Sequence, residues 1–236
     1  VQLRGMLMQN VIPAGTGTMA AIVDLGEQQT EQICLEAAHN QVVSIANLNT
    51  PKQFVISGHA EAVARAVDLA MQLGGRGIPL NVSGPFHSEL MRPAADGMRD
   101  MLARVRFSTP RMPVICNVTA APVVSSDCLA DLLVQQITSR VDWLGTINRM
   151  QELGVTEILE IGPGRILCGL IEKTAPSIQL SSIGNFDEVL KCYGTLMAAV
   201  RRDLLRAGWL DLGEQLVSAD GNQIRSLFRE NDAAPK

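Results

Sequence analysis

Four short apolar stretches decide the fold of the first part of this sequence: TMAAIVDL at 18–25, QVVSIANL at 41–48, QFVIS at 53–57 and IPLNV at 78–82. Each has the length and the composition of a β-strand. The residues NTPK at 49–52 join the two middle strands, and their Asn, Thr and Pro predict a hairpin turn.

The two longer segments between these strands have helical spacing. Residues 28–38 place Ile33, Cys34 and Ala37 on one face, and residues 61–73 carry a second apolar face that ends at two glycines. The order strand, helix, strand, strand, helix, strand predicts a ferredoxin-like unit, in which two helices cover one face of a four-stranded sheet.

The chain beyond residue 88 alternates helix and strand patterns. We expect a helix from residue 88 or 93 to 105, and further helices at 129–138, 141–153, 165–173 and 187–202. Strands are expected at 113–118, 157–161 and 178–183. This alternation predicts a parallel sheet covered on both faces, and therefore an α/β protein. The pattern weakens after residue 203, and we expect 203–236 to be a partly disordered C-terminal extension.

Composition excludes several classes of protein. The chain has 236 residues, 47% of them hydrophobic, with 20 basic against 24 acidic residues. That is enough to bury a core in one large or two unequal domains, and the net charge of −4 provides no general attraction for nucleic acid or an anionic membrane. No apolar run approaches the roughly 20 residues of a membrane span. We expect a cytoplasmic monomer with neither nucleic acid nor membrane as a partner.

The five cysteines are scattered without the spacing of a metal site or a disulfide framework. We expect all five to be buried free thiols, which are common in the cytosol. No spacing in the sequence implies a metal or a redox cofactor.

His87 is the first candidate for chemistry. It follows Pro85 and Phe86 at the junction of a predicted strand and a helix, where functional side chains gather in α/β proteins. A histidine without a function at the start of a helix is the alternative. The chain has no GxSxG motif, so no serine nucleophile is indicated beside it. His39 and His59 lie in turns and are expected to be solvated.

Arg4 is the second candidate. It lies in a helix-like run, LRGMLMQ at 3–9, whose residues Leu3, Met6 and Leu7 are expected to face inward. A solvated arginine is one interpretation. The other is a guanidinium that binds a carboxylate through two charge-assisted hydrogen bonds.

Five motifs together resemble the malonyl-CoA:acyl carrier protein transacylase family. They are LRGxLMQ at 3–9, PxGTGxMAAI at 13–22, ANxNxPxQxVISG at 46–58, PLxVSGPFHSxLMxPAA at 79–95 and EIGPGxxL at 160–167. They follow the family order over about residues 1–200. The resemblance implies that residues 1–12 and 88–202 belong to an α/β-hydrolase-like subdomain and that residues 13–87 are a ferredoxin-like subdomain inserted in it.

The resemblance also implies functions for individual residues. His87 matches the base that deprotonates a serine, and Arg4 matches the arginine that pairs with the malonyl carboxylate. Gln136 falls where the family places a glutamine whose main-chain carbonyl orients the histidine, although Gln135 is adjacent.

Three further residues have both a functional and a structural interpretation. Phe86 resembles the malonyl-selecting form of the motif, and it equally fits a plain core position. Asn47 and Asn49 are candidates for the wall of the substrate cleft, but a strand end and a turn are ordinary places for asparagine.

Malonyl-CoA as substrate and acyl carrier protein as partner are the expectations that follow, with no cofactor. The serine and the oxyanion-hole glutamine of the family belong to a part that would precede Val1. We therefore expect the C-terminal portion of a transacylase, from fatty-acid or polyketide synthesis, that is inactive by itself.

Two alternatives and one candidate surface remain open. One alternative is a non-catalytic module that binds acyl carrier protein or acyl-CoA. The other is a regulatory ferredoxin-like domain, which explains only residues 16–86. For an acidic carrier, a basic stretch at 88–113 is either a docking face or a solvated surface, with arginines at Arg92, Arg99, Arg104, Arg106 and Arg111.

Overall fold

An antiparallel sheet forms the centre of the first 80 residues. Its strands are β1 (Gly17–Val23), β2 (Val43–Thr50), β3 (Gln53–His59) and β4 (Arg76–Pro79), and their order is β4-β1-β3-β2. The hairpin between β2 and β3 lies where the sequence predicts it. The last strand starts two residues before the predicted stretch, because Arg76–Pro79 is the segment that pairs with β1.

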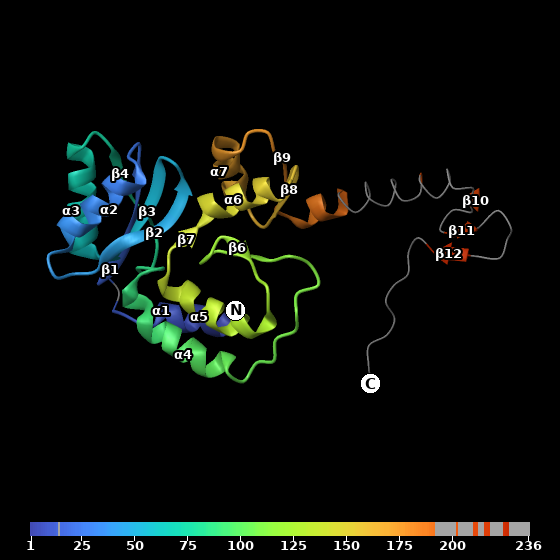
Figure 1. Cartoon of the computed structure of the whole chain (residues 1–236), viewed down its shortest axis with the longest axis horizontal. Coiled ribbons are helices and arrows are strands. Elements are labelled where there is room, and N and C mark those ends of the chain that lie inside the picture. The colour runs from blue at the N-terminus through green and yellow to red at the C-terminus, as the bar shows by residue number, and fades with distance from the viewer. Residues whose placement is uncertain (14, 192–201, 203–209, 212–214, 218–223, 227–236) are drawn as a thin grey trace. The chain divides into compact units, whose positions relative to one another are not determined.

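Helices α2 (Glu27–Ala38) and α3 (Ala60–Gln72) cover one face of this sheet (Figure 1). Ile22, Phe54 and Ile56 of the strands are buried in one cluster with Ile33 and other apolar residues of the two helices. Because side chains alternate along a strand, the neighbouring residues point to the opposite face. There Met19, Ala46 and Val55 form a second, smaller cluster, and this face carries the site described below.

A helical layer forms a separate core. It consists of α1 (Gln2–Gln9), α4 (Arg92–Leu102) and α5 (Leu129–Thr138), which lie side by side (Figure 1). Met8 of α1 is buried here, whereas Leu3 and Met6 are 37% and 54% exposed. The expectation that Leu3 and Met6 face inward is therefore wrong, because α1 turns Met8 and the partly buried Leu7 toward α4.

The remaining described elements are short. They are η1 (Glu89–Met91), β5 (Ile115–Cys116), β6 (Ala121–Pro122), η2 (Ser126–Cys128), β7 (Val141–Asp142), α6 (Trp143–Glu152), β8 (Glu157–Ile161), α7 (Ile166–Thr174), β9 (Gln179–Ile183), a helix described over residues 186–191, and β10 (Leu210–Asp211), β11 (Gln215–Val217) and β12 (Ile224–Ser226).

In the second part of the chain the described strands form separate pairings rather than one continuous parallel sheet. Among the described residues, β5 pairs only with β6 and β8 only with β9, while β7 joins the first sheet parallel to β2. The chain is thus a mixed α/β protein with a mostly antiparallel central sheet. An alternating sequence pattern predicts strands but not their neighbours, and a parallel sheet needs a neighbour for each strand.

The computed structural model describes residues 1–13, 15–191, 202, 210–211, 215–217 and 224–226. Contacts divide the chain into two units, one of Val1–Ile158 with Leu167–Gln179 and one of Leu159–Ile166 with Leu180–Lys236. All predicted site residues belong to the first unit. Most of the expected C-terminal extension lies outside the described residues, and its described part is the three-stranded sheet β10-β11-β12. None of the described helices is long and apolar enough to cross a membrane.

Candidate active site

A cavity of about 620 Å³ lies on the sheet face that α2 and α3 leave uncovered. Residues of α1, of strands β1 to β3 and of the segment after β4 line it: Arg4, Gly5, Met8, Gln9, Met19, Asn47, Asn49, Val55, Leu80, Val82, Ser83, Phe86 and His87. Five of the six residues singled out in the sequence therefore meet at one cavity. The sixth, Gln136, is absent from the cavity wall, but its carbonyl contacts His87 Nδ1.

The turn at residues 83–88 presents His87. The Ser88 hydroxyl is buried and donates a hydrogen bond of 2.7 Å to the Pro85 carbonyl, which closes the turn. His87 has a φ of 58°, a left-handed conformation that is uncommon for a residue with a side chain. Pro85 lies against Gly17 so closely that a Cβ at Gly17 would come within 2.5 Å of the ring. A residue with a side chain at position 17 would therefore displace this turn.

The end of α5 determines which nitrogen of His87 carries the proton. Nδ1 lies 2.9 Å from the Gln136 carbonyl oxygen and 3.1 Å from the Ser139 carbonyl oxygen. A carbonyl only accepts hydrogen bonds, so Nδ1 must donate and must hold the hydrogen. Nε2 of the neutral ring is then left with a lone pair, as a general base requires.

The surroundings of His87 favour its neutral form. Burial of the ring lowers its pKa below the usual value, the Ser139 and Gln136 carbonyls oppose this, and the positive charge of Arg4 lowers the pKa further. The two carbonyls lie at the carboxyl end of a helix, where the helix dipole favours a cation. They would stabilise the imidazolium that forms when Nε2 takes up a proton.

Arg4 contributes a positive charge without a counter-ion in the described part of the chain. Its Nε is buried and has no hydrogen-bond partner there. Buried polar atoms are nearly always hydrogen-bonded, so an unpartnered Nε on a residue that lines the cavity is unusual. A guanidinium that lacks a partner is suited to a carboxylate.

Phe86 lies in the cavity wall and in the apolar packing at once. Its half-buried ring packs against the sheet-face cluster and against the helical layer, and it also lines the cavity. Asn47 and Asn49 line the same cavity from β2, where shifts of register interrupt the pairing with β3. The two asparagines share one face because they are two positions apart on a strand.

The Ser139 carbonyl is the functional group that sequence reasoning missed. A main-chain carbonyl leaves no trace in the identity of its residue, so no local signal points to it. His59 is also more than a solvated turn residue, because its Nδ1 accepts a hydrogen bond of 2.9 Å from the Val42 N–H. The described residues contain no group of three or more His, Cys, Asp or Glu arranged to hold a metal.

Comparison with known proteins agrees with this geometry. Residues 1–200 match the acyl transferase domain family. The chain belongs to this family. The resemblance seen in the five motifs is thereby confirmed at the level of the family.

Individual relatives carry the more specific name. The malonyl CoA-acyl carrier protein transacylase of Escherichia coli strain K12 is 41% identical over 184 residues, which are 78% of this chain and 60% of the relative. That of Bacillus subtilis strain 168 is 37% identical over 198 residues, 83% of this chain and 62% of the relative. The chain thus spans about three fifths of the length of these curated relatives.

Solved structures of this acyl transferase group share the fold. An acyl carrier protein S-malonyltransferase of Vibrio cholerae superposes with a TM-score of 0.78 at 38% identity, over 81% of this chain and 63% of that one. A malonyl-transacylase in complex with its type II PKS acyl-carrier protein gives a TM-score of 0.77 at 38% identity, over 80% of this chain and 62% of that one.

Proposed function

We propose that this chain forms the acyl-binding and base-bearing part of a malonyl-CoA:acyl carrier protein transacylase. One observation carries the proposal: Arg4, with its buried and unpartnered Nε, and His87, with its tautomer set by two carbonyls, line the same cavity. A carboxylate-binding cation beside a base suits a substrate that bears a free carboxylate and a reactive thioester.

The reaction divides between these residues and a serine. His87 Nε2 takes the proton of the serine hydroxyl as its oxygen attacks the thioester carbon, and the C–S bond to coenzyme A breaks. The imidazolium returns the proton to the departing sulfur. In the second half, the thiol of the carrier's phosphopantetheine loses its proton to His87 as its sulfur attacks the malonyl carbon, the bond to the serine oxygen breaks, and the imidazolium returns the proton to that oxygen.

The finer architecture is part of the same proposal. The sheet β4-β1-β3-β2 with α2 and α3 would be a ferredoxin-like subdomain inserted in an α/β-hydrolase-like subdomain that contains α1, α4 and α5. The motifs support this division, and the reactive serine would come from a segment outside these 236 residues.

Phe86 would favour malonyl over methylmalonyl groups. Its ring forms part of the cavity wall and is held by two apolar clusters, so it has little room to move away from an α-methyl branch. One methyl group is typically worth about 1–3 kcal/mol of discrimination.

Titration calorimetry of the chain with malonyl-CoA and with acetyl-CoA tests carboxylate recognition. Arg4→Ala should weaken malonyl-CoA binding by about 10- to 100-fold, the value of one or two charged hydrogen bonds, and leave acetyl-CoA binding unchanged. Arg149→Ala, which removes a surface arginine paired with Glu152, is the control. Equal losses for both ligands would overturn the assignment of Arg4.

Intact-mass analysis of the chain after exposure to malonyl-CoA tests the source of the serine. We expect no hydroxylamine-sensitive malonyl adduct on these 236 residues. An adduct would show that the nucleophile lies within the chain, with Ser83 on the cavity wall as the first position to examine by Ser83→Ala.

A further inference from the structure

Two ion pairs of Arg140 connect helix α2 to the segment after α5, whose Ser139 carbonyl contacts His87. We call these ion pairs the tether. Arg140 follows Ser139 directly, and its Nη1 lies 3.1 Å from Glu27 Oε1 and 3.6 Å from Glu31 Oε1. Both glutamates belong to α2, more than 100 residues earlier in the chain. Ser139, the residue directly before Arg140, thus carries the carbonyl that binds His87 Nδ1.

Some other anchors of this segment are short-range: the Ser139 N–H donates to the Gln135 carbonyl of α5, and Asp142 accepts hydrogen bonds from Gly145 and Thr146 of α6. Val141 and Asp142 form the two-residue strand β7, which pairs with Asn47 and Leu48 of β2. The Asp142 N–H also donates to the Asn117 carbonyl. Ser139 lies just before this short strand and just after the last turn of α5, where helices fray. A side-chain anchor on Arg140 would therefore restrict the Ser139 carbonyl more than it would inside a long strand or helix.

We propose that Arg140 is a positioning residue for His87: its ion pairs with Glu27 and Glu31 hold the segment after α5 so that the Ser139 carbonyl stays on Nδ1. Arg140 is absent from the wall of the active-site cavity, so it acts through the main chain. Ion pairs on the α2 face of the sheet thereby affect the orientation of the base on the opposite face. Only the catalytic consequence of this effect rests on the proposed function of His87.

The direction in which the pKa of His87 changes distinguishes an effect of the Arg140 charge from an effect on the Ser139 carbonyl. Arg4 of α1 is the charged side chain that acts on the ring, while α5 and the following segment contribute the carbonyls of Gln136 and Ser139. If Arg140 acted on His87 only through its charge, Arg140→Gln would raise the pKa of His87 or leave it unchanged. If Arg140 holds the carbonyl, the same change lowers the pKa, because a hydrogen bond to the protonated ring weakens.

The experiment is an NMR titration of the imidazole of His87 in the whole chain, with the exchange of its Nδ1 proton measured in parallel. Arg140→Gln should lower the pKa of His87 and speed this exchange by about two- to fivefold, the effect of losing a surface ion-pair network on a local opening. Arg149→Gln is the matched control, because Arg149 is also 44% exposed and forms an ion pair, with Glu152 of its own helix. It should change neither value.

A second variant tests the tether from its other end. Glu27→Gln with Glu31→Gln should speed the exchange as much as Arg140→Gln does, and adding Arg140→Gln to it should have no further effect. An unchanged or raised pKa in Arg140→Gln, or additive effects on exchange, would overturn the proposal. No substrate is needed, so a failure of the tether is distinguishable from a failure of the proposed transacylase.

Discussion

Protonation of the His87 imidazole makes the stability of the fold depend on pH. Burial lowers its pKa in the folded protein below the value of about 6.5 that it has when unfolded. Between these two values the unfolded chain binds more protons, so the free energy of unfolding falls as the pH falls through this window. We expect urea unfolding to show this loss in the natural chain and a smaller loss in His87→Gln. Parallel pH profiles of the two proteins would contradict it.

Cys34 shows how burial controls reactivity at a single residue. Burial, and to a lesser extent the negative charge of Glu31, raises the pKa of its thiol to about 12. The described Cys116 and Cys128 are only partly buried, contrary to expectation, and Cys192 lies outside the described residues. Peptide mapping after brief iodoacetamide treatment at pH 8 should find Cys116 and Cys128 alkylated and Cys34 unmodified, because the thiolate is the reactive form. Alkylation of Cys34 at a similar rate would show that α2 opens readily.

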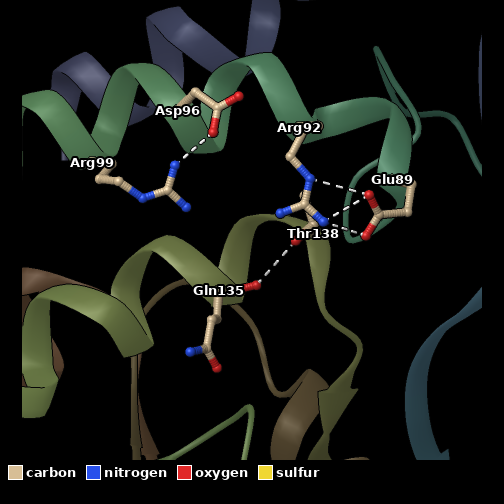
Figure 2. A network of polar contacts seen from close by, with 6 residues as sticks. All are labelled: Glu89, Arg92, Asp96, Arg99, Gln135 and Thr138. Carbon is tan, nitrogen blue, oxygen red and sulfur yellow. Dashed lines mark hydrogen bonds and ion pairs between the residues drawn. The ribbon is translucent and has the colours of Figure 1, made fainter.

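At the scale of elements, α4 and its flanks carry the arginines of the basic stretch in two groups. Arg92 forms an ion pair with Glu89 and Arg99 forms one with Asp96, each at 2.6 Å. Figure 2 shows the two pairs on the same face of this helical region. These pairs support the interpretation of this part of the basic stretch as a solvated surface. Beyond the helix, Arg104, Arg106 and Arg111 are exposed, and the sequence has no acidic residue between Asp100 and Asp127. In the described part of the chain, the unpaired positive charge of this stretch therefore lies after α4, and a proposed acidic carrier would meet it there.

A binding measurement with an acyl carrier protein separates the two groups of arginines. Arg104→Glu with Arg106→Glu should weaken binding about tenfold at low salt, and the loss should shrink as salt is added. Arg92→Glu with Arg99→Glu changes the net charge equally and should have a smaller effect, because those arginines are already paired. Equal losses would mean that net charge alone, and no particular surface, attracts the carrier.

At the scale of the whole first unit, the cavity joins two cores. Arg4 and Met8 come from the helical layer, while Met19, Asn47 and Val55 come from the sheet. A ligand that contacts both walls binds only when they are together, so its binding opposes their separation. Hydrogen exchange should slow in α1 and in β2 when malonyl-CoA is added, with little change in α3 on the opposite face. Protection of β2 without α1 would place the ligand away from Arg4.

Local sequence patterns determined much of this protein. The elements of residues 13–87, the hairpin, and the helices at 129–138 and 166–174 lie within a few residues of their predicted positions, because side-chain periodicity and turn residues act over a few neighbours. Arg4, Phe86 and His87 belong to motifs of side chains that can be read directly in the sequence, and the three residues line one cavity.

Tertiary structure decided what depends on residues far apart in the chain. Packing between distant segments determines which face of α1 is buried and which strands pair in the second part of the chain. It also determines the second carbonyl on His87 and the ion pairs of Arg140 with α2. Main-chain carbonyls are the same in every residue, and exposed charges have many potential partners. Only the folded arrangement selects among them.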